Sequence, residues 1–323
     1  MLNRRYLRIK VYQALYAYWQ GDPATTSRLE KELYQGIDRV HDLYLSLMLV
    51  LGELRHVAEL RMEERRKKRL PTPEDLNPNR RFVENALITG VAESEALRAE
   101  CEKRRISWVG HHELFMALFK AIEESEAYKA YMAEPATSFT KDRAFVVELF
   151  SEQVANSESL QDVYEARSIY WLEDLDLAAG LVKRVLEQWR QDGGGPQALS
   201  AITQDPAEER GFVNDLFRAS IAFSDEHEAL IAAKASNWEA DRIAYTDMIL
   251  MKMALAEVRT FDQIPVKVTL NEYIEIAKAY STPKSKNFIN GVLDKLFVEL
   301  RADGRIRKVG RGLLEIGRAS CRE

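Results

Sequence analysis

The chain has 323 residues, of which 46% are hydrophobic and 30% are charged, and its formal net charge at pH 7 is −5. This composition is that of an ordinary soluble globular protein with room for two packed units, and its few glycines and prolines favour long helices over a turn-rich β fold. The negative net charge excludes a protein whose whole surface binds a polyanion, so any nucleic-acid surface must be local.

Several kinds of functional site have no pattern in this sequence. Cys101 and Cys321 form neither a disulfide framework nor a metal-ligand spacing, and no stretch approaches the roughly 18 apolar residues of a membrane-spanning helix. There is no phosphate-binding glycine loop, nucleophile elbow or metalloprotease motif. We therefore expect a cytoplasmic binding protein that is not an enzyme and that has no cofactor, metal site or membrane contact.

The first predicted helix, residues 3–20, has an unusual charge pattern. Its opening turns hold four cations and no acid, namely Arg4, Arg5, Arg8 and Lys10. Cations cost stability there, because the N-terminus of a helix is the positive end of its macrodipole. The cations form either a solvated charged face or a phosphate-binding surface, on which Gln13 and Tyr16 could hydrogen-bond to bases or stack on them.

A much longer helix is predicted from about residue 28 to residue 69. It ends in five basic residues, 65–69. Cations are favourable at a helix C-terminus, and we prefer this interpretation to a second RNA contact. The prolines that follow, Pro71, Pro73 and Pro78, predict a linker.

Beyond that linker the sequence contains an internal repeat. A Phe-Val pair is followed at constant spacing by an acid and then by a tryptophan; the three copies are Phe82, Glu95 and Trp108, then Phe145, Glu158 and Trp171, then Phe212, Asp225 and Trp238. We expect each phenylalanine and tryptophan to be a core residue. The repeat predicts stacked helical units, and residues 192–196 between the second and third copies predict a flexible linker.

The C-terminal part predicts further helices. Trp238 opens a helix through Glu257, in which Arg242 and Asp247 could form a surface pair network. Residues 264–295 predict two helices joined at a corner, where Pro283 ends the first. The inward faces are expected to carry Val268, Ile274, Ala277 and Tyr280 on the first helix and Phe288, Ile289, Val292, Leu293 and Leu296 on the second. Lys284 and Lys286 make the corner basic.

These motifs resemble those of the NusB family of transcription antitermination factors. V-K-V-T-L-N-E-Y-I-E-I-A-K-A-Y-S followed by F-I-N-G-V-L-D-K is similar to the family's C-terminal signature, and the N-terminal R-R-x-x-R…Q-A-L-Y is similar to the segment with which the family contacts boxA RNA. The segment from Trp238 to Leu250 resembles a region that contributes to binding NusE, a ribosomal small-subunit protein. The chain is about twice the usual family length.

The resemblance implies an all-α fold, with a NusB-like helical bundle core and an inserted helical-repeat module. The core would comprise residues 1–20 and 205–313, and the inserted module residues 21–192. Residues 315–323 back-translate into a string that resembles a sequencing adapter, and we interpret them as a non-native tail.

The resemblance also implies which residues bind. The expected RNA-binding residues are Arg4, Arg5, Arg8, Lys10, Gln13, Tyr16, Lys284, Lys286 and Phe288, although an aromatic at helical spacing such as Phe288 is equally expected in the core. The expected partner-binding residues are Arg242 and Asp247.

The implied function is antitermination at ribosomal RNA operons. The protein would bind boxA-type RNA together with NusE, and would act through them on RNA polymerase and other Nus factors. Two alternatives stay open: a non-catalytic helical-repeat scaffold with a NusB-like end, and an accessory domain of an RNA methyltransferase. The missing glycine-rich cofactor loop argues against a catalytic partner within this chain.

Overall fold

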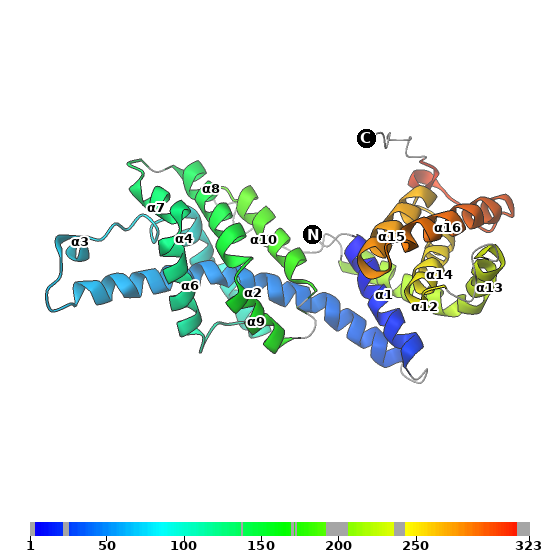
Figure 1. The fold of residues 1–323 in the computed structure, drawn as a ribbon, viewed down its shortest axis with the longest axis horizontal. Coiled ribbons are helices and arrows are strands. Elements are labelled where there is room, and N and C mark those ends of the chain that lie inside the picture. The colour runs from blue at the N-terminus through cyan, green and yellow to red at the C-terminus, as the bar shows by residue number, and fades with distance from the viewer. Residues whose placement is uncertain are drawn as a thin grey trace. The chain divides into compact units, whose positions relative to one another are not determined.

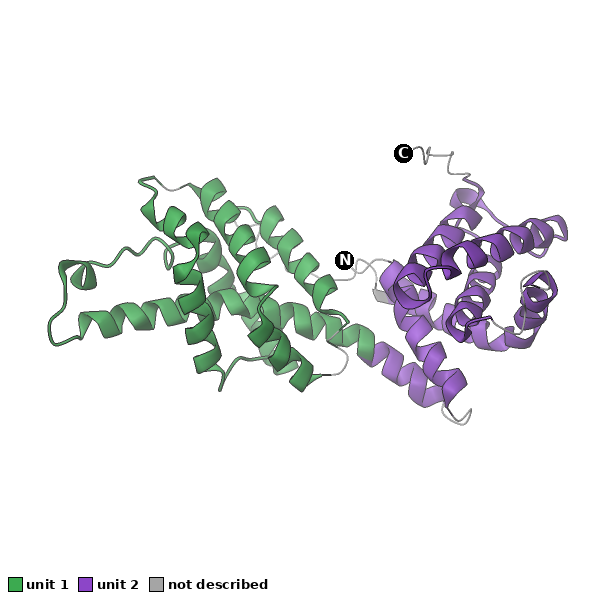
Figure 2. Cartoon of the chain, in the orientation of Figure 1, with its two compact units in different colours: residues 1, 36–202 green, residues 2–35, 203–323 purple. Residues whose placement is uncertain are grey.

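The structure is a computed structural model that describes residues 4–21, 26–136, 138–168, 171, 173–191, 206–235 and 243–314. Within these ranges the chain forms helices and no strands, which confirms the predicted all-α class (Figure 1). It divides into two compact units, one of residues 1 and 36–202 and one of residues 2–35 and 203–323 (Figure 2). The predicted linker at 192–196 and the tail at 315–323 lie outside the described residues.

The first unit is a set of helices around most of the long helix α2, Thr26–Arg66. The helices that follow in this unit are α3 Pro73–Leu76, α4 Ala86–Ala92, α5 Glu95–Arg104, α6 His112–Glu124, α7 Glu126–Ala133, α8 Phe139–Leu149, the π-helix η2 Phe150–Val154, α9 Glu158–Arg167 and α10 Leu175–Gln188. Helix α8 packs against α4, α7 and α10.

The repeated tryptophans fasten two of the helical units to α2. The indole N–H of Trp108 donates to the carbonyl of Ser46, and that of Trp171 donates to the carbonyl of Arg39, both at 2.9 Å. Arg39 and Ser46 lie about two turns apart on α2, so the two copies use equivalent positions. Both tryptophans are buried, as are Phe82, Phe145 and Phe212, which confirms these predicted core residues. Trp238 lies outside the described residues.

The repeated acids mark helix starts. Glu95 and Glu158 are the first residues of α5 and α9, directly after a serine that caps each helix. The Ser94 hydroxyl accepts from the N–H of Leu97, and the Ser157 hydroxyl accepts from the N–H of Leu160. An acid in the first turn also complements the macrodipole, so the constant spacing has a local cause.

The second unit joins the N-terminal helix to the C-terminal helices. Its elements are α1 Arg4–Gln20, the start of α2, α12 Pro206–Ala222, α13 Ser224–Ala235, α14 Tyr245–Thr260, α15 Val266–Tyr280, α16 Ser285–Ala302 and the 3₁₀ helix η4 Gly310–Leu313. Helix α14 is central, because α1, α12, α13, α15 and α16 all pack against it. Helix α1 also packs against α12 and α15, although the sequence separates it widely from both (Figure 1).

The two helices predicted within 264–295 are confirmed as α15 and α16, but the predicted inner face of α15 is partly wrong. Val268, Ile274 and Tyr280 are half-buried, whereas the buried side chains of α15 are Thr269, Tyr273, Ile276 and Ala277. The physical reason is that the hydroxyls of Thr269 and Tyr273 bond to a buried carboxylate, Glu257. On α16 the inward positions Ile289, Val292, Leu293 and Leu296 are confirmed.

Candidate nucleic-acid interface

A buried ion pair holds α1 in the second unit. The guanidinium of Arg8 donates from Nε and Nη2 to the two carboxylate oxygens of Glu257, each at 2.7 Å, and the two side chains are 2% and 0% exposed. Thr269 Oγ1 and Tyr273 Oη also donate to Glu257, at 2.7 and 3.1 Å. Buried charges need this degree of hydrogen bonding to be tolerated, so the network fixes both the position and the rotation of α1.

Burial and the charge of Glu257 shift the pKa values of Arg8 and Tyr273. Burial alone would lower the pKa of Arg8, but the hydrogen bond and charge of Glu257 outweigh it and raise that pKa. Burial raises the pKa of Tyr273 well above its usual value, and the charge of Glu257 raises it further. Arg8 therefore stays cationic and Tyr273 stays a neutral donor.

The first two arginines of α1 are held at the surface. Arg5 forms a bidentate pair with Glu272 of α15, with N–O distances of 2.8 and 2.9 Å, and Arg4 pairs with Glu208 of α12. Their side chains remain 43% and 45% exposed. Carboxylates from other helices thus offset the unfavourable placement of cations at a helix start.

These arginines border an open hollow with a volume of about 560 Å³. Arg4, Arg5, Arg8 and Arg311 line it, together with Glu272 and apolar side chains around Pro265. The hollow combines several cations with one acid, so it is a suitable place for an anionic group.

Two of the residues predicted to contact RNA, Arg8 and Lys10, are buried in the structure. Arg8 is fully engaged with Glu257, and Lys10 is 6% exposed with its amine 5.3 Å from the centre of the Tyr6 ring. Both side chains therefore serve the packing of α1. Helical spacing alone could not distinguish the buried Arg8 and Lys10 from the exposed Arg4 and Arg5. The acids that contact Arg8 lie on helices that are distant in the sequence.

The other predicted RNA-binding residues lie toward the opposite end of α1. Gln13 is half-buried, and Tyr16 is 41% exposed with its ring edge-on to Tyr245 at 5.5 Å. At the start of α16, Lys284 and Lys286 are exposed and Phe288 is half-buried.

Two contacts show how these groups are arranged along α1. Arg5 meets Glu272, whereas Tyr12 meets Tyr280, the last residue of α15, at 5.5 Å between ring centres. The predicted residues therefore fall into an opening group, Arg4 and Arg5, and a corner group, Gln13, Tyr16, Lys284, Lys286 and Phe288. Arg5 and Tyr12 are about 10 Å apart along the axis of α1.

The corner itself is held by a chain of hydroxyl groups. Ser281 Oγ donates to the carboxylate of Asp247 and lies 3.0 Å from the Oγ of Ser285, which is 2.8 Å from Thr282 Oγ1. Asp247, predicted to contact a partner, is 4% exposed and connects α14 to the corner through Ser281. Arg242 lies outside the described residues.

Sequence reasoning missed the acids that organise the interface, Glu208, Glu257 and Glu272. Only Glu257 had a local signal, since it is the one acid in the apolar run from Ile249 to Val258. Among the described residues, no group of three or more His, Cys, Asp or Glu side chains could hold a metal ion. Within the described ranges, no helix has the length and apolarity needed to cross a membrane.

These features define an all-α protein with a local cationic and aromatic surface on a chain of negative net charge. A model described as "NusB family" matches residues 177–297. The transcription antitermination protein NusB of Salinibacter ruber (strain DSM 13855 / M31) is 40% identical over 143 residues, which cover 43% of this chain and 89% of that protein. The chain therefore belongs to the NusB family of transcription antitermination proteins, as its motifs predict.

Two further relatives carry the same name. The protein of Chloroherpeton thalassium (strain ATCC 35110 / GB-78) is 41% identical over 107 residues, or 33% of this chain and 51% of that protein. The protein of Listeria monocytogenes serotype 4a (strain HCC23) is 38% identical over 103 residues, or 32% of this chain and 79% of that protein. No solved structure matches this chain.

The family match does not include α1. It begins within α10 of the first unit and ends in α16. The fold nevertheless places α1 in the second unit, against α12, α14 and α15. Helix α1 therefore packs against the matched region although it lies outside the match.

Proposed function

We propose that this chain binds boxA-type RNA of ribosomal RNA operons together with NusE, and so promotes processive transcription without catalysing a reaction. Arg4 and Arg5 meet RNA phosphates at the opening of α1. Lys284 and Lys286 attract the same strand at the corner, and an unstacked base lies on Tyr16 or Phe288. RNA polymerase and other Nus factors are reached indirectly, and the complex works in the cytoplasm.

The observation that carries this proposal is the buried pair of Arg8 and Glu257. It holds α1 so that Arg4 and Arg5 remain partly exposed beside the hollow. The carboxylates that meet these two arginines form partly exposed pairs, which contribute about 0–1 kcal/mol each in water. A phosphate can therefore replace Glu208 or Glu272 at little cost, and counterions released from the RNA add to the affinity.

We further propose that residues 21–192 are an insertion into a core built from the N-terminal and C-terminal segments. The discontinuous second unit supports this interpretation, since it consists of residues 2–35 and 203–323. The second unit extends past residue 20, however, and includes the start of α2 up to residue 35, which moves the start of the insertion to about residue 36. There Glu30 pairs with Arg218 at 2.9 Å, and Arg210 lies 5.5 Å from the Tyr34 ring centre.

The experiment that tests the function is fluorescence anisotropy with a labelled boxA RNA and a scrambled RNA of equal length, each with and without NusE. We expect NusE to tighten binding of the boxA RNA more than binding of the scrambled RNA. Lys284→Ala/Lys286→Ala should weaken the binding of both RNAs by a similar factor, because phosphate contacts carry no sequence information. Absence of RNA affinity even with NusE would contradict the proposal and favour the helical-repeat scaffold.

A further inference from the structure

A C-terminal strap, residues 305–314, is fastened to the turn between α14 and α15. The amine of Lys308 donates to the carbonyl of Phe261 at 2.7 Å, and the N–H of Val309 donates to the carbonyl of Asp262 at 3.2 Å. Gly312 lies so close that a β-carbon there would be 1.9 Å from the Asp262 oxygen. The strap is thus fixed at several points and forms a stable wall.

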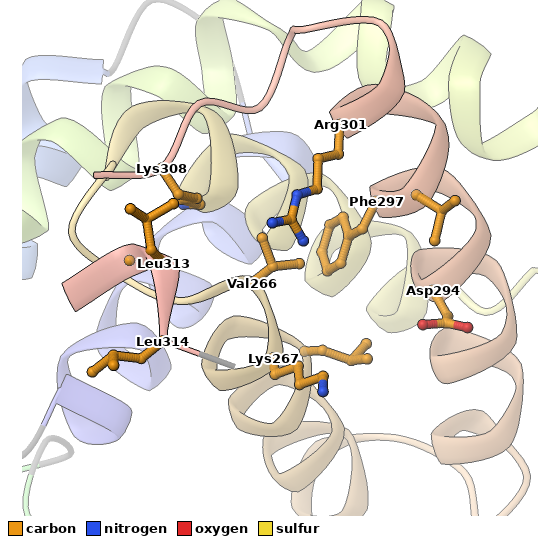
Figure 3. A pocket seen from close by; sticks show the side chains of 11 residues that line it. Val266, Lys267, Asp294, Phe297, Arg301, Lys308, Leu313 and Leu314 are labelled. Atoms are coloured by element: carbon orange, nitrogen blue, oxygen red, sulfur yellow. The ribbon is translucent and has the colours of Figure 1, made fainter. Parts of the chain in front are cut away.

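This wall closes one side of a small pocket between α15 and α16 (Figure 3). Val266, Leu270 and Phe297 supply its apolar interior, and Leu313 of the strap lies opposite them. The cavity volume is about 150 Å³, the size of an engineered apolar cavity that admits benzene. One leucine or phenylalanine side chain is therefore a suitable occupant.

The surface around the pocket is unusually apolar. Of the large apolar side chains that the described residues leave exposed, four lie on the last part of α16 or on the strap: Val298 (65%), Val309 (44%), Leu313 (58%) and Leu314 (63%). Scattered exposed apolar residues are normal, but a local concentration beside a pocket marks an interaction site.

The rim of the pocket is cationic. Lys267, Arg301 and Lys308 line it against a single acid, Asp294, and Figure 3 shows Arg301 directed from α16 toward Val266 and Phe297. The strap carries four cations and no acid. Arg305 pairs with Glu226 at 3.5 Å and Lys308 donates to Phe261, while Arg307 and Arg311 add to the positive charge. On a chain with a net charge of −5, this local excess selects an anionic partner.

We propose that this pocket docks an acidic peptide segment of a partner protein. One aliphatic or aromatic anchor residue enters the pocket, and carboxylates on either side of it meet Lys267 and Arg301. The pocket chemistry favours a peptide over RNA, because the exposed apolar groups are aliphatic and the only ring in the lining, Phe297, is 3% exposed. A base would find no aromatic face on which to stack.

The test uses a fluorescein-labelled peptide with a central Leu-Phe pair between runs of Asp and Glu, followed by anisotropy. Two comparison peptides replace Leu-Phe by Ala-Ala, or every acid by Lys. The site variant is Lys267→Glu/Leu313→Asp. Its matched control is Arg66→Glu/Leu70→Asp, which makes the same kinds of change at two exposed residues of the first unit.

We expect the acidic Leu-Phe peptide to bind at least tenfold more tightly than either comparison peptide. The site variant should lose most of this affinity, and the control should keep it. Equal binding of the three peptides, or equal loss in both variants, would overturn the proposal. So would a concentration-dependent dimer in sedimentation velocity that the site variant abolishes, since a second copy would then be the occupant.

Two additional measurements distinguish the peptide from the C-terminal tail and from RNA as the occupant of the pocket. A variant that ends at Leu314 should bind the peptide with the same affinity as the full chain. A large gain in that affinity would identify residues 315–323 as the occupant and contradict the proposal. Binding of boxA RNA should be the same in the site variant and its control. If RNA binding falls with peptide binding, the pocket is part of the RNA surface and the proposal is wrong. If the chain binds no RNA but still binds the peptide, only the proposed antitermination mechanism fails.

Discussion

At the scale of single residues, the decisive interaction is between Arg8 and Glu257. Both side chains are buried, and every oxygen of the carboxylate has a donor. Removing one member of such a pair leaves an uncompensated buried charge, which typically costs about 3–5 kcal/mol. The partly exposed pair of Arg4 and Glu208 contributes far less.

Replacement of Arg8 by methionine should therefore destabilise the second unit by roughly 3–5 kcal/mol. Arg4→Met is the matched control and should change stability by less than about 1 kcal/mol. Hydrogen exchange of the α14 amides, measured over a urea series, reports this unit separately from the first. Equal protection in the two variants would show that the buried pair does not hold α1.

His227 gives the fold a dependence on pH. Burial lowers the pKa of His227 to about 4, and the charge of Arg259, whose Nη1 lies 3.3 Å from the imidazole Nε2, adds to this effect. The unfolded chain has the ordinary pKa of about 6.5, so it binds more protons than the folded chain between the two values. The contribution of His227 to the free energy of unfolding is therefore fully present above about pH 6.5, and it is lost as the pH is lowered toward 4.

The expected loss from His227 between pH 6.5 and pH 4 is roughly 3 kcal/mol. His227→Gln should flatten the profile of stability against pH in this window, whatever its effect at pH 7. His56→Gln serves as a control for histidine replacement. A profile for His227→Gln that falls as steeply as that of the wild type would contradict the assignment.

At the scale of elements, local sequence predicted several helices but not all of their bounds. Helix α14 begins at Tyr245 and not at Trp238, since residues 243 and 244 are not helical, and α2 ends at Arg66 and not at residue 69. The predicted proline linker contains the short helix α3, because Thr72 caps it and Pro73 suits a first helical turn.

The bounds of α1 and the corner between α15 and α16 follow from local residues such as Pro283. The inner face of α15 does not, because Thr269 and Tyr273 turn inward toward a carboxylate on another helix. A polar residue at an inward position is invisible to a hydrophobic pattern until its partner is known.

The strap offers a prediction at this scale. Gly312→Ala should displace the strap, since the new methyl group would overlap the carbonyl of Asp262. Exchange at the amide of Val309, which donates to that carbonyl, should accelerate at least tenfold. Gly211→Ala on α12 is the control, because nothing lies within 4 Å of its added β-carbon. Unchanged exchange at Val309 in Gly312→Ala would show that the strap accommodates the methyl group.

At the scale of the whole molecule, the family could be predicted from the sequence, because its signature is continuous in α15 and α16. The sequence could not predict which of the N-terminal arginines are buried and which are exposed. Arg8 turns inward and Arg4 and Arg5 outward only because Glu257, Glu208 and Glu272 come from three different helices. Contacts between segments so distant in sequence leave no local pattern.

We propose that the opening of α1 is an RNA surface, which the rest of the second unit holds in place. The most direct measurement compares boxA RNA affinity, at several salt concentrations, for wild type, Arg4→Ala/Arg5→Ala and a matched pair, Arg66→Ala/Arg69→Ala, in the basic residues at and just after the end of α2. We predict an affinity loss of about tenfold or more and a shallower salt dependence for the first pair only. Equal effects of the two pairs, or no effect of the first, would contradict the claim.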